Sequence, residues 1–203
     1  MAALKGGDKL TARLNQIAAN LAKASSVDVG FMAGSTEPDG TSTALGAALN
    51  EYGGTINVAA GETTIYRMTN AAGTGFLRKG RFVKASKSNF ASTHTHEAYT
   101  ITRPPRPFFR NAIVKNQGQW PADIAASLKA NNYDAKKALN EVGQKIQEEI
   151  QDSIVDLTSP PLAASTIARK SRGRVSKMAG VLGPAKPLVD SGTMLRSPTH
   201  LVK

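Results

Sequence analysis

The sequence of 203 residues predicts an α+β protein in which a small antiparallel sheet packs against helices. Apolar residues recur at three- and four-residue spacing in several stretches, and the longest of these spans about 134–157. Short alternating runs near both ends of the chain are typical of half-buried strands. Residues 55–102 combine strand-like runs with small, polar and basic residues, and we interpret them as an inserted β-hairpin or extended arm. Residues 1–54 and 103–203 then form a single core domain.

The first part of the chain predicts a helix, a strand and a second helix. We expect the first helix from about Asp8 to Ala24, with Asp8 as its N-cap and four apolar residues on one face: Leu10, Leu14, Ile17 and Leu21. The alternation at 27–32 predicts a strand. The second helix, 43–52, follows Thr41 or Ser42 as its cap and ends at Gly53-Gly54, because helix ends favour glycine. One of its faces carries Leu45, Ala48, Leu49 and Tyr52.

Two strands are expected in the inserted arm. The run 63–68 is a fair strand, and 97–102 is the expected returning strand. The intervening segment 86–96 is polar and carries few structural signals, so we expect it to be irregular.

Helices dominate the second half of the core domain. Pro107 fits the first turn of a helix that continues through Ile113, and another helix is expected from about Pro121 to Lys129. Asp134 is expected to cap the longest helix, whose apolar stripe comprises Leu139, Val142, Ile146, Ile150, Ile154 and Leu157. The rest should be a short turn at 165–170, a flexible basic loop at 171–186, a tight turn with one helical turn at 189–195, and a final strand at 197–202.

Positive charge is concentrated in two loop-rich segments. The chain carries a net charge of +11, of which residues 67–110 hold +8 and residues 160–203 hold +7, while the two other parts are each −2. A nearby polyanion would explain this concentration. The alternative is a solvated basic surface that keeps the subunit soluble.

The composition excludes several classes of protein. The absence of cysteine excludes disulfides, thiolate nucleophiles and thiolate metal sites, and it fits synthesis in a reducing cytoplasm. The first eight residues contain no apolar signal core, and no stretch approaches the roughly 18 apolar residues of a membrane helix. We therefore expect a soluble protein without a membrane partner.

The sequence gives no positive sign of catalysis. The only histidine cluster comprises His94, His96 and Glu97, and it lies in a polar segment without rigid support, so exposed polar residues are preferred over a zinc site. The glycines at 73, 75 and 80 lack the spacing of a phosphate-binding loop. Asp190-Ser191-Gly192 is not the nucleophile elbow of a hydrolase. We expect no enzyme, metal or cofactor.

The basic arm suggests two kinds of contact. Its cations interleave with aromatic residues, as in surfaces that bind nucleic acid, and the candidates to face DNA are Arg67, Arg78, Lys79, Arg81, Lys84 and Lys87. Such contact would be independent of sequence and sensitive to salt, since no DNA-reading motif accompanies the cations. Alternatively, the phenylalanines anchor the arm on a neighbouring subunit while the cations face solvent.

Three separated pieces of the sequence resemble one protein family. The first is Asn50-Glu51-Tyr52-Gly53 with its flanking residues, and the second is the proline-rich run 104–110. The third pairs 160–170 with 186–194, after the long amphipathic helix. In this order they resemble the tail-completion, or neck, proteins of tailed bacteriophages, which are virion morphogenesis proteins of the head–tail junction. The inserted arm departs from the family pattern, in which the glycine turn leads more quickly into the proline-rich run.

The resemblance implies a structural virion protein, made in the host cytoplasm and located in the virion neck. It implies a homo-oligomeric ring, a hexamer, between portal-side connector or adaptor proteins and tail terminator or tail tube proteins, with genomic DNA in the lumen. The residues expected at subunit or partner interfaces are Phe76, Phe82, Phe108, Phe109, Arg110, Leu188 and Met194. Two alternatives stay open: a sequence-independent nucleic-acid-binding protein, and an adjacent head-closure or adaptor ring protein.

Overall fold

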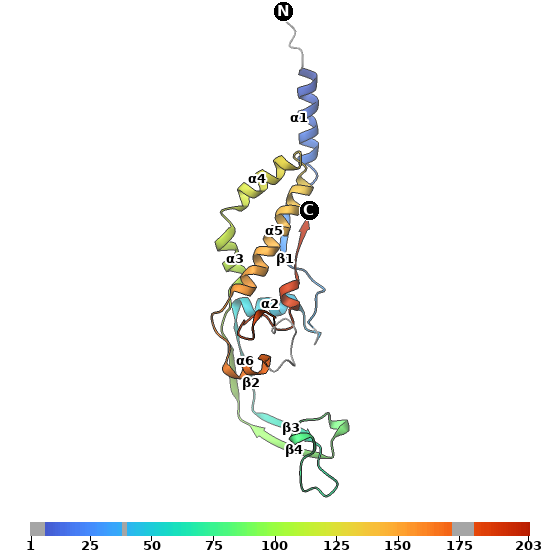
Figure 1. Ribbon diagram of the computed structural model, residues 1–203, viewed down its shortest axis with the longest axis vertical. Helices are drawn as coiled ribbons and strands as arrows, with labels where there is room; N and C mark the ends of the chain where they lie inside the picture. The colour runs from blue at the N-terminus through green and yellow to red at the C-terminus, as the bar shows by residue number, and fades with distance from the viewer. Residues whose placement is uncertain (1–6, 38–39, 172–180) are drawn as a thin grey trace, which may run out of the picture. The chain divides into compact units, whose positions relative to one another are not determined.

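The chain is α+β, as its sequence predicts (Figure 1). A computed structural model describes residues 7–37, 40–171 and 181–203. The chain divides into two compact units, of which one comprises Met1–Gly53 with Pro104–Lys203 and the other Gly54–Arg103.

The first unit contains helices and one two-stranded sheet. Its sheet pairs β1 (Val27–Phe31) antiparallel with β6 (Pro198–Val202), so segments far apart in the sequence lie side by side. Its helices are α1 (Gly7–Leu21), α2 (Thr43–Tyr52), α3 (Phe108–Asn116), α4 (Trp120–Ala130), α5 (Ala135–Asp156), α6 (Ala164–Ser171) and α8 (Thr193–Arg196).

Helix α5 supports this unit, as its apolar stripe predicts. Asp134 caps it, because the carboxylate accepts a hydrogen bond from the Lys137 N–H at 3.2 Å. The helix packs against α3, α4, β1 and β6. The main core cluster comprises Ala47, Phe108, Ala112, Ile150, Ile154, Leu157, Leu188, Val189 and Met194.

Gly143 allows α5 to approach the sheet closely. A methyl group at this position would lie 2.8 Å from Val27 Cγ2 and 2.9 Å from His200 Cδ2, closer than carbon atoms pack. The His200 ring is itself held by Gln147 and Asn140 of α5, each at 3.1 Å. The glycine thus sets the distance between helix and sheet.

The second unit is a β-ribbon in a single register. Strand β2 (Gly54–Val58) pairs with β5 (Tyr99–Arg103), and β3 (Gly61–Arg67) pairs with β4 (Phe90–His96), both antiparallel. The two ladders share one register, which is interrupted by residues 59–60 on one strand and 97–98 on the other. The short 3₁₀ turns η1 (Leu77–Gly80) and η2 (Ala85–Lys87) follow β3 in the chain. Every residue of this unit is described, and none of them is buried.

The strands of the arm differ from the prediction. Residues 90–96 were expected to be irregular, but they form β4, in which Thr93 lies opposite Thr64 with their hydroxyls 3.3 Å apart. The expected returning strand pairs with β2 and not with β3. The register of the ribbon explains this difference. Residue 90 pairs with residue 67, so in the same register residues 99–103 pair with β2, which precedes β3 in the chain.

Two other expectations change in the first unit, and a third is not tested. Helix α1 begins at Gly7, so Asp8 lies in its first turn instead of at the N-cap, and the helix ends at Leu21. The short turn expected at 165–170 is part of helix α6. The flexible loop expected at 171–186 lies mostly outside the described residues, which include only its two ends.

Candidate functional site

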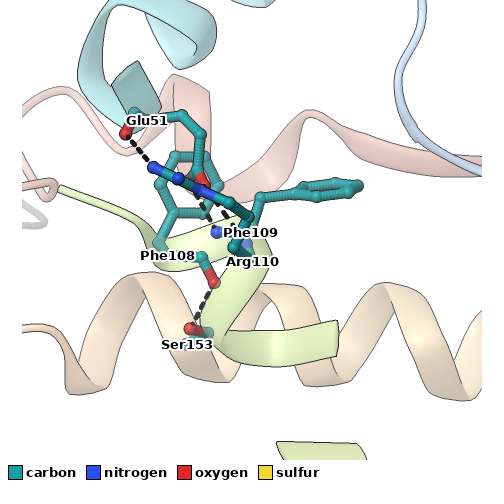
Figure 2. A network of polar contacts seen from close by, with 5 residues as sticks. All are labelled: Glu51, Phe108, Phe109, Arg110 and Ser153. Carbon is teal, nitrogen blue, oxygen red and sulfur yellow. Dashed lines mark hydrogen bonds and ion pairs between the residues drawn. The ribbon is translucent and has the colours of Figure 1, made fainter. Parts of the chain in front are cut away.

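Glu51 joins the first two family-like segments (Figure 2). Its carboxylate accepts hydrogen bonds from the Phe109 N–H at 2.9 Å, the Arg110 N–H at 3.2 Å and Arg110 Nε at 2.7 Å. Arg110 Nη2 also donates to the Glu51 carbonyl at 3.1 Å. Because the first N–H groups of a helix lack intrahelical partners, this buried carboxylate caps α3 from another helix.

Two more hydrogen bonds hold the proline-rich run. The Arg106 N–H donates to the Asn50 carbonyl at 2.7 Å. Ser153 of α5 donates its hydroxyl to the Phe108 carbonyl at 2.6 Å, as Figure 2 shows. The entry into α3 is therefore tied both to the end of α2 and to the supporting helix α5.

Lys170 joins the two halves of the third family-like segment. Its ammonium donates to the carbonyls of Lys186 at 2.9 Å and Val189 at 2.8 Å, although the residue is only 5% exposed. Desolvation by burial lowers the pKa of Lys170, and the nearby Asp190 carboxylate opposes this shift. A buried charge needs hydrogen-bonding partners, and here two backbone carbonyls supply them.

The Asp190-Ser191-Gly192 turn leads into α8, with Gly192 at the N-cap position. The Ser191 hydroxyl accepts a hydrogen bond from the Thr193 N–H at 3.1 Å. Gly192 has a φ of 79°, a left-handed conformation that favours glycine. Asn50 Nδ2 lies 3.9 Å from Met194 Sδ, so the first and third family-like segments also meet.

Three of the predicted interface residues belong to the core. Phe108, Leu188 and Met194 are 1%, 7% and 7% exposed, so the chain itself covers them and their apolar side chains stabilise the unit. The single chain therefore leaves little surface of these three side chains for the predicted contact with a partner. Phe109 is half-buried, with its ring edge-on to Phe108. Arg110 remains exposed, and its guanidinium lies 5.2 Å from the centre of the Tyr52 ring.

The phenylalanines predicted to anchor the arm are exposed and surround Arg67. Phe76 is 45% exposed and Phe82 is 67% exposed. The guanidinium carbon of Arg67 lies 5.0 Å and 5.2 Å from the centres of these two rings. Arg67 therefore differs from the other predicted DNA-facing cations, because two aromatic rings hold it within its own unit.

The remaining predicted cations form a basic cluster, 78–87. It comprises Arg78, Lys79, Arg81, Lys84 and Lys87, all of which are exposed. Among the residues that the structure describes, none of these five takes part in an ion pair. Arg78 and Lys79 also adopt left-handed backbone conformations, with φ of 51° and 57°. The cluster therefore offers cationic groups that its own chain leaves unneutralised.

The histidine pair lies on a strand, where an irregular loop was expected. His94 Nε2 is 3.2 Å from the Ser92 hydroxyl, and His96 packs edge-on against Tyr99. Glu97 follows the strand and offers its backbone carbonyl to His96 Nδ1 at 3.2 Å. Within the described ranges, no group of three or more metal-ligating side chains lies close enough to hold an ion.

The structure also shows that apolar faces of α1 and α2 are exposed. The periodicity of apolar residues in the sequence did not predict this exposure. On α1, Leu10 and Leu14 are 63% and 56% exposed. On α2, the predicted apolar face points to solvent, and the helix instead buries Thr43, Ala47 and Glu51. Leu45, Leu49 and Tyr52 stay exposed on that helix.

The first unit also contains two apolar hollows. The larger, of about 460 Å³, is lined by residues of β1, α3, α4 and α5, and we call it the α5 groove. The smaller, of about 260 Å³, adjoins the Glu51 network and is lined by residues of α2, β1 and α3. Hollows of this kind are where ligands or partner side chains bind.

Comparisons with protein-family models, with curated proteins and with solved structures found no match to this chain. Among the described helices, none has the length and apolar character needed to cross a membrane.

Proposed function

We propose that this protein is a structural subunit of a tailed-phage neck, a ring protein that joins the head connector to the tail. One observation carries the proposal: apolar surface is left exposed on α1 and α2, and no residue of the unit Gly54–Arg103 is buried. Exposed apolar patches mark interaction sites, and an isolated two-stranded ribbon is marginally stable in water. A subunit that completes its burial in an assembly fits both facts.

The family-like segments support the same proposal. Glu51 ties the first segment to the second, Lys170 ties the two halves of the third, and Asn50 meets Met194. These contacts hold the exposed face of α2 and the Arg110 side chain in a fixed arrangement. In this proposal the polar residues Glu51, Lys170 and Asn50 act as a scaffold, and the surfaces around them make the assembly contacts.

The proposed assembly is a hexameric ring in the virion neck. Portal-side connector or adaptor proteins lie on one side of the ring, and tail terminator or tail tube proteins on the other, with genomic DNA in the lumen. The role is one of shape and fit between rings, without a catalytic step.

Mass measurements test this function. We expect the purified chain to associate beyond the monomer in solution, and we expect tailed particles from a source that encodes it to contain it at ring-like stoichiometry. A stable monomer that is absent from particles would contradict the proposal. A position next to the portal, or further towards the head, would assign the chain to a head-closure or adaptor ring.

A second candidate function is sequence-independent nucleic-acid binding, which the basic cluster 78–87 favours. Exposed cations without ion-pair partners release counterions from a phosphate backbone, so binding should weaken steeply with salt. The test compares Lys79→Gln/Lys84→Gln with Lys129→Gln/Lys136→Gln, which also removes two exposed lysines, but from α4 and α5. The first pair should lower the salt slope by up to about 1.8 and the second should not. No binding of the unaltered chain to duplex DNA at low salt would contradict this function.

A further inference from the structure

We propose that α1 of one copy docks in the α5 groove of a second copy, which makes a head-to-tail contact between subunits. The occupant is a second copy of this chain, and the contact deepens the proposed function by naming the interface that builds the assembly. The α1 contact itself does not require the proposed function; only the closure of the assembly into a ring rests on it.

Helix α1 binds its own chain through polar side chains. Arg13 Nη2 donates to Asn132 Oδ1 at 3.4 Å, and Asn20 Nδ2 donates to the Asn132 carbonyl at 3.1 Å. Just beyond the helix, Lys23 forms an ion pair with Asp134 at 2.7 Å. These contacts all lie at the turn between α4 and α5, so the helix is attached at one place by its polar face.

The turn that receives α1 is itself unusual. Asn132 and Tyr133 have φ of 53° and 62°, a left-handed conformation that residues other than glycine rarely adopt. This backbone directs both the carbonyl and the side chain of Asn132 towards α1. Backbone strain of this kind persists where surrounding contacts maintain it. The attachment of α1 is therefore a built feature of the fold.

The apolar face of α1 lacks a cover within its own chain. Leu10, Leu14 and Leu21 are exposed, and none of the residues of this helix, all of which are described, is buried. A helix of this length is marginally stable in water by itself, and packing of its apolar face normally stabilises it. In Figure 1, α1 extends away from the α4–α5 turn and does not lie along α5. Its own groove is therefore not its partner.

The α5 groove matches this helix in chemistry and in length. Its lining is mostly apolar and includes Val29, Ile113, Ile124, Leu139, Ile146 and Ile150. The lining residues of α5 run from 139 to 150, and the leucine stripe of α1 runs from 10 to 21. Both stretches advance by about 16 Å at the helical rise per residue. Beside the groove, β1 has no second strand partner within the described chain.

Charge selects the direction of the docked helix. Glu149 is the acidic residue in the groove lining, near the end of α5. If α1 runs antiparallel to α5, so that 10–21 lies along 150–139, Lys9 approaches Glu149; if it runs parallel, Lys9 lies at the opposite end of the groove from Glu149. Antiparallel helices also align their dipoles favourably. The antiparallel arrangement places Leu14 next to Ile146.

A contact between two different surfaces of one chain is heterologous. Each subunit then uses α1 towards one neighbour and the α5 groove towards the other. Such contacts repeat around a closed ring, or extend as a filament where the rotation does not close. This geometry fits a ring of more than two subunits and not an isologous dimer.

Engineered disulfides test the contact, since the chain contains no cysteine. The full chain with Leu14→Cys and Ile146→Cys should form linked dimers and higher species on mild oxidation, which reductant reverses. The matched control carries Leu14→Cys with Gln144→Cys, a position on the exposed side of α5. Linkage no greater than in the control, or a bond within one chain, would overturn the proposal.

A second measurement does not depend on a cysteine in the groove. Leu14→Asp places a charge on the exposed apolar face and should weaken self-association at least tenfold in sedimentation experiments. Asn15→Asp adds the same charge one residue away, on another face, and should leave association unchanged. Equal association of both variants would refute the α1 contact. If both variants associate equally but the chain is found in particles, the α1 contact is refuted and the proposed function stands. If the disulfide forms between copies but the chain is absent from particles, the α1 contact stands and the proposed function is refuted.

Discussion

Glu51 shows how one side chain can connect segments that lie far apart in sequence. It belongs to α2, yet its carboxylate serves the N-terminus of α3 and the guanidinium of Arg110. A buried carboxylate without partners would be strongly unfavourable, so the pairing and the burial depend on each other. The residue is a structural one, and the exposed side of Arg110 is what remains for a partner.

Replacement of Glu51 tests this role. Glu51→Ala should lower the free energy of unfolding by about 2–4 kcal/mol, because two helix N–H groups and a guanidinium lose their acceptor. Glu51→Gln keeps an acceptor oxygen and should lower the free energy of unfolding by less than Glu51→Ala does. Glu148→Ala removes an exposed glutamate from α5 and serves as the control in urea unfolding. Equal losses for Glu51→Ala and Glu148→Ala would contradict the assignment.

Asp134 should make the fold sensitive to acid. The hydrogen bond from Lys23, with that from the Lys137 N–H, lowers the pKa of Asp134 from its ordinary value of 3.8. The unfolded chain therefore binds more protons in acid, so this stabilisation is present above pH 3.8 and is lost as the pH falls through the folded-state pKa.

The Asp134→Asn variant tests whether Asp134 causes this loss of stability in acid. Asparagine also caps helices, but it does not titrate, so the variant should be less stable near neutral pH and should lose less stability between about pH 5 and pH 2. Thermal unfolding across that range is the measurement. Parallel pH profiles for the two proteins would show that another group is responsible.

Residue roles were predictable where the interaction is local. Asp134 and Ser42 act as caps within three residues of their partners, and the sequence predicts Asp134 for α5 and either Thr41 or Ser42 for α2. Glu51 and Lys170 belong to recognisable segments, but their partners lie 58 and 19 residues away. No local rule connects such distant groups, so only the fold shows what they bind.

Among the elements, α5 and the β1–β6 sheet define the first unit. Their separation depends on Gly143, which faces Val27 and the ring of His200. Overpacking here competes with a helix propensity that favours alanine by about 1 kcal/mol. Because Val27 is stiff and the His200 ring is held on both nitrogens, the contact cannot relax easily.

We therefore expect Gly143→Ala to destabilise the protein by about 1–3 kcal/mol overall. The matched control is Gly46→Ala in α2, where an added methyl group meets no atom within 4 Å. That variant should be stabilised by about 0.5–1 kcal/mol through helix propensity alone. Urea unfolding of both variants measures the difference, and a stabilised Gly143→Ala would show that the sheet moves freely.

The helices were predictable and the strands less so. A period of three to four residues identified α5 over its whole length, and glycine marked the end of α2. Strand β4 was not predicted, because its Ser, Thr and His residues show little hydrophobic alternation on an exposed ribbon. Its position follows from pairing with β3, a property of two segments together.

At the scale of the molecule, the two units differ in how they are stabilised. All residues of the main core cluster belong to the first unit, and the second has only its ladders and surface contacts. Gly54 lies opposite Arg103 in the β2–β5 ladder, so the two ends of the ribbon are neighbours.

The ribbon should therefore be removable. Replacing residues 54–103 with two glycines should leave a first unit that unfolds cooperatively, with stability within about 1 kcal/mol of the full chain. The isolated ribbon should not fold by itself. Circular dichroism and thermal unfolding check both statements. Loss of the cooperative transition in the shortened chain would show that the ribbon supports the core.

What covers α1 and α2 could not be predicted from one chain. An apolar stripe has the same period whether its cover is the protein's own core or another subunit. The sequence thus indicated the stripe of Leu10, Leu14 and Leu21, and only the fold shows that it stays open.

Because β1 pairs with β6, the sheet of the first unit can form only late in translation. During translation, β1 is complete after residue 31, while its only described partner strand ends at residue 202. At roughly 5–20 residues per second, the ribosome needs on the order of ten seconds or more to supply that partner. Unfinished chains therefore lack the sheet against which α5 packs. We therefore expect the first unit to complete its fold only after β6 has been made.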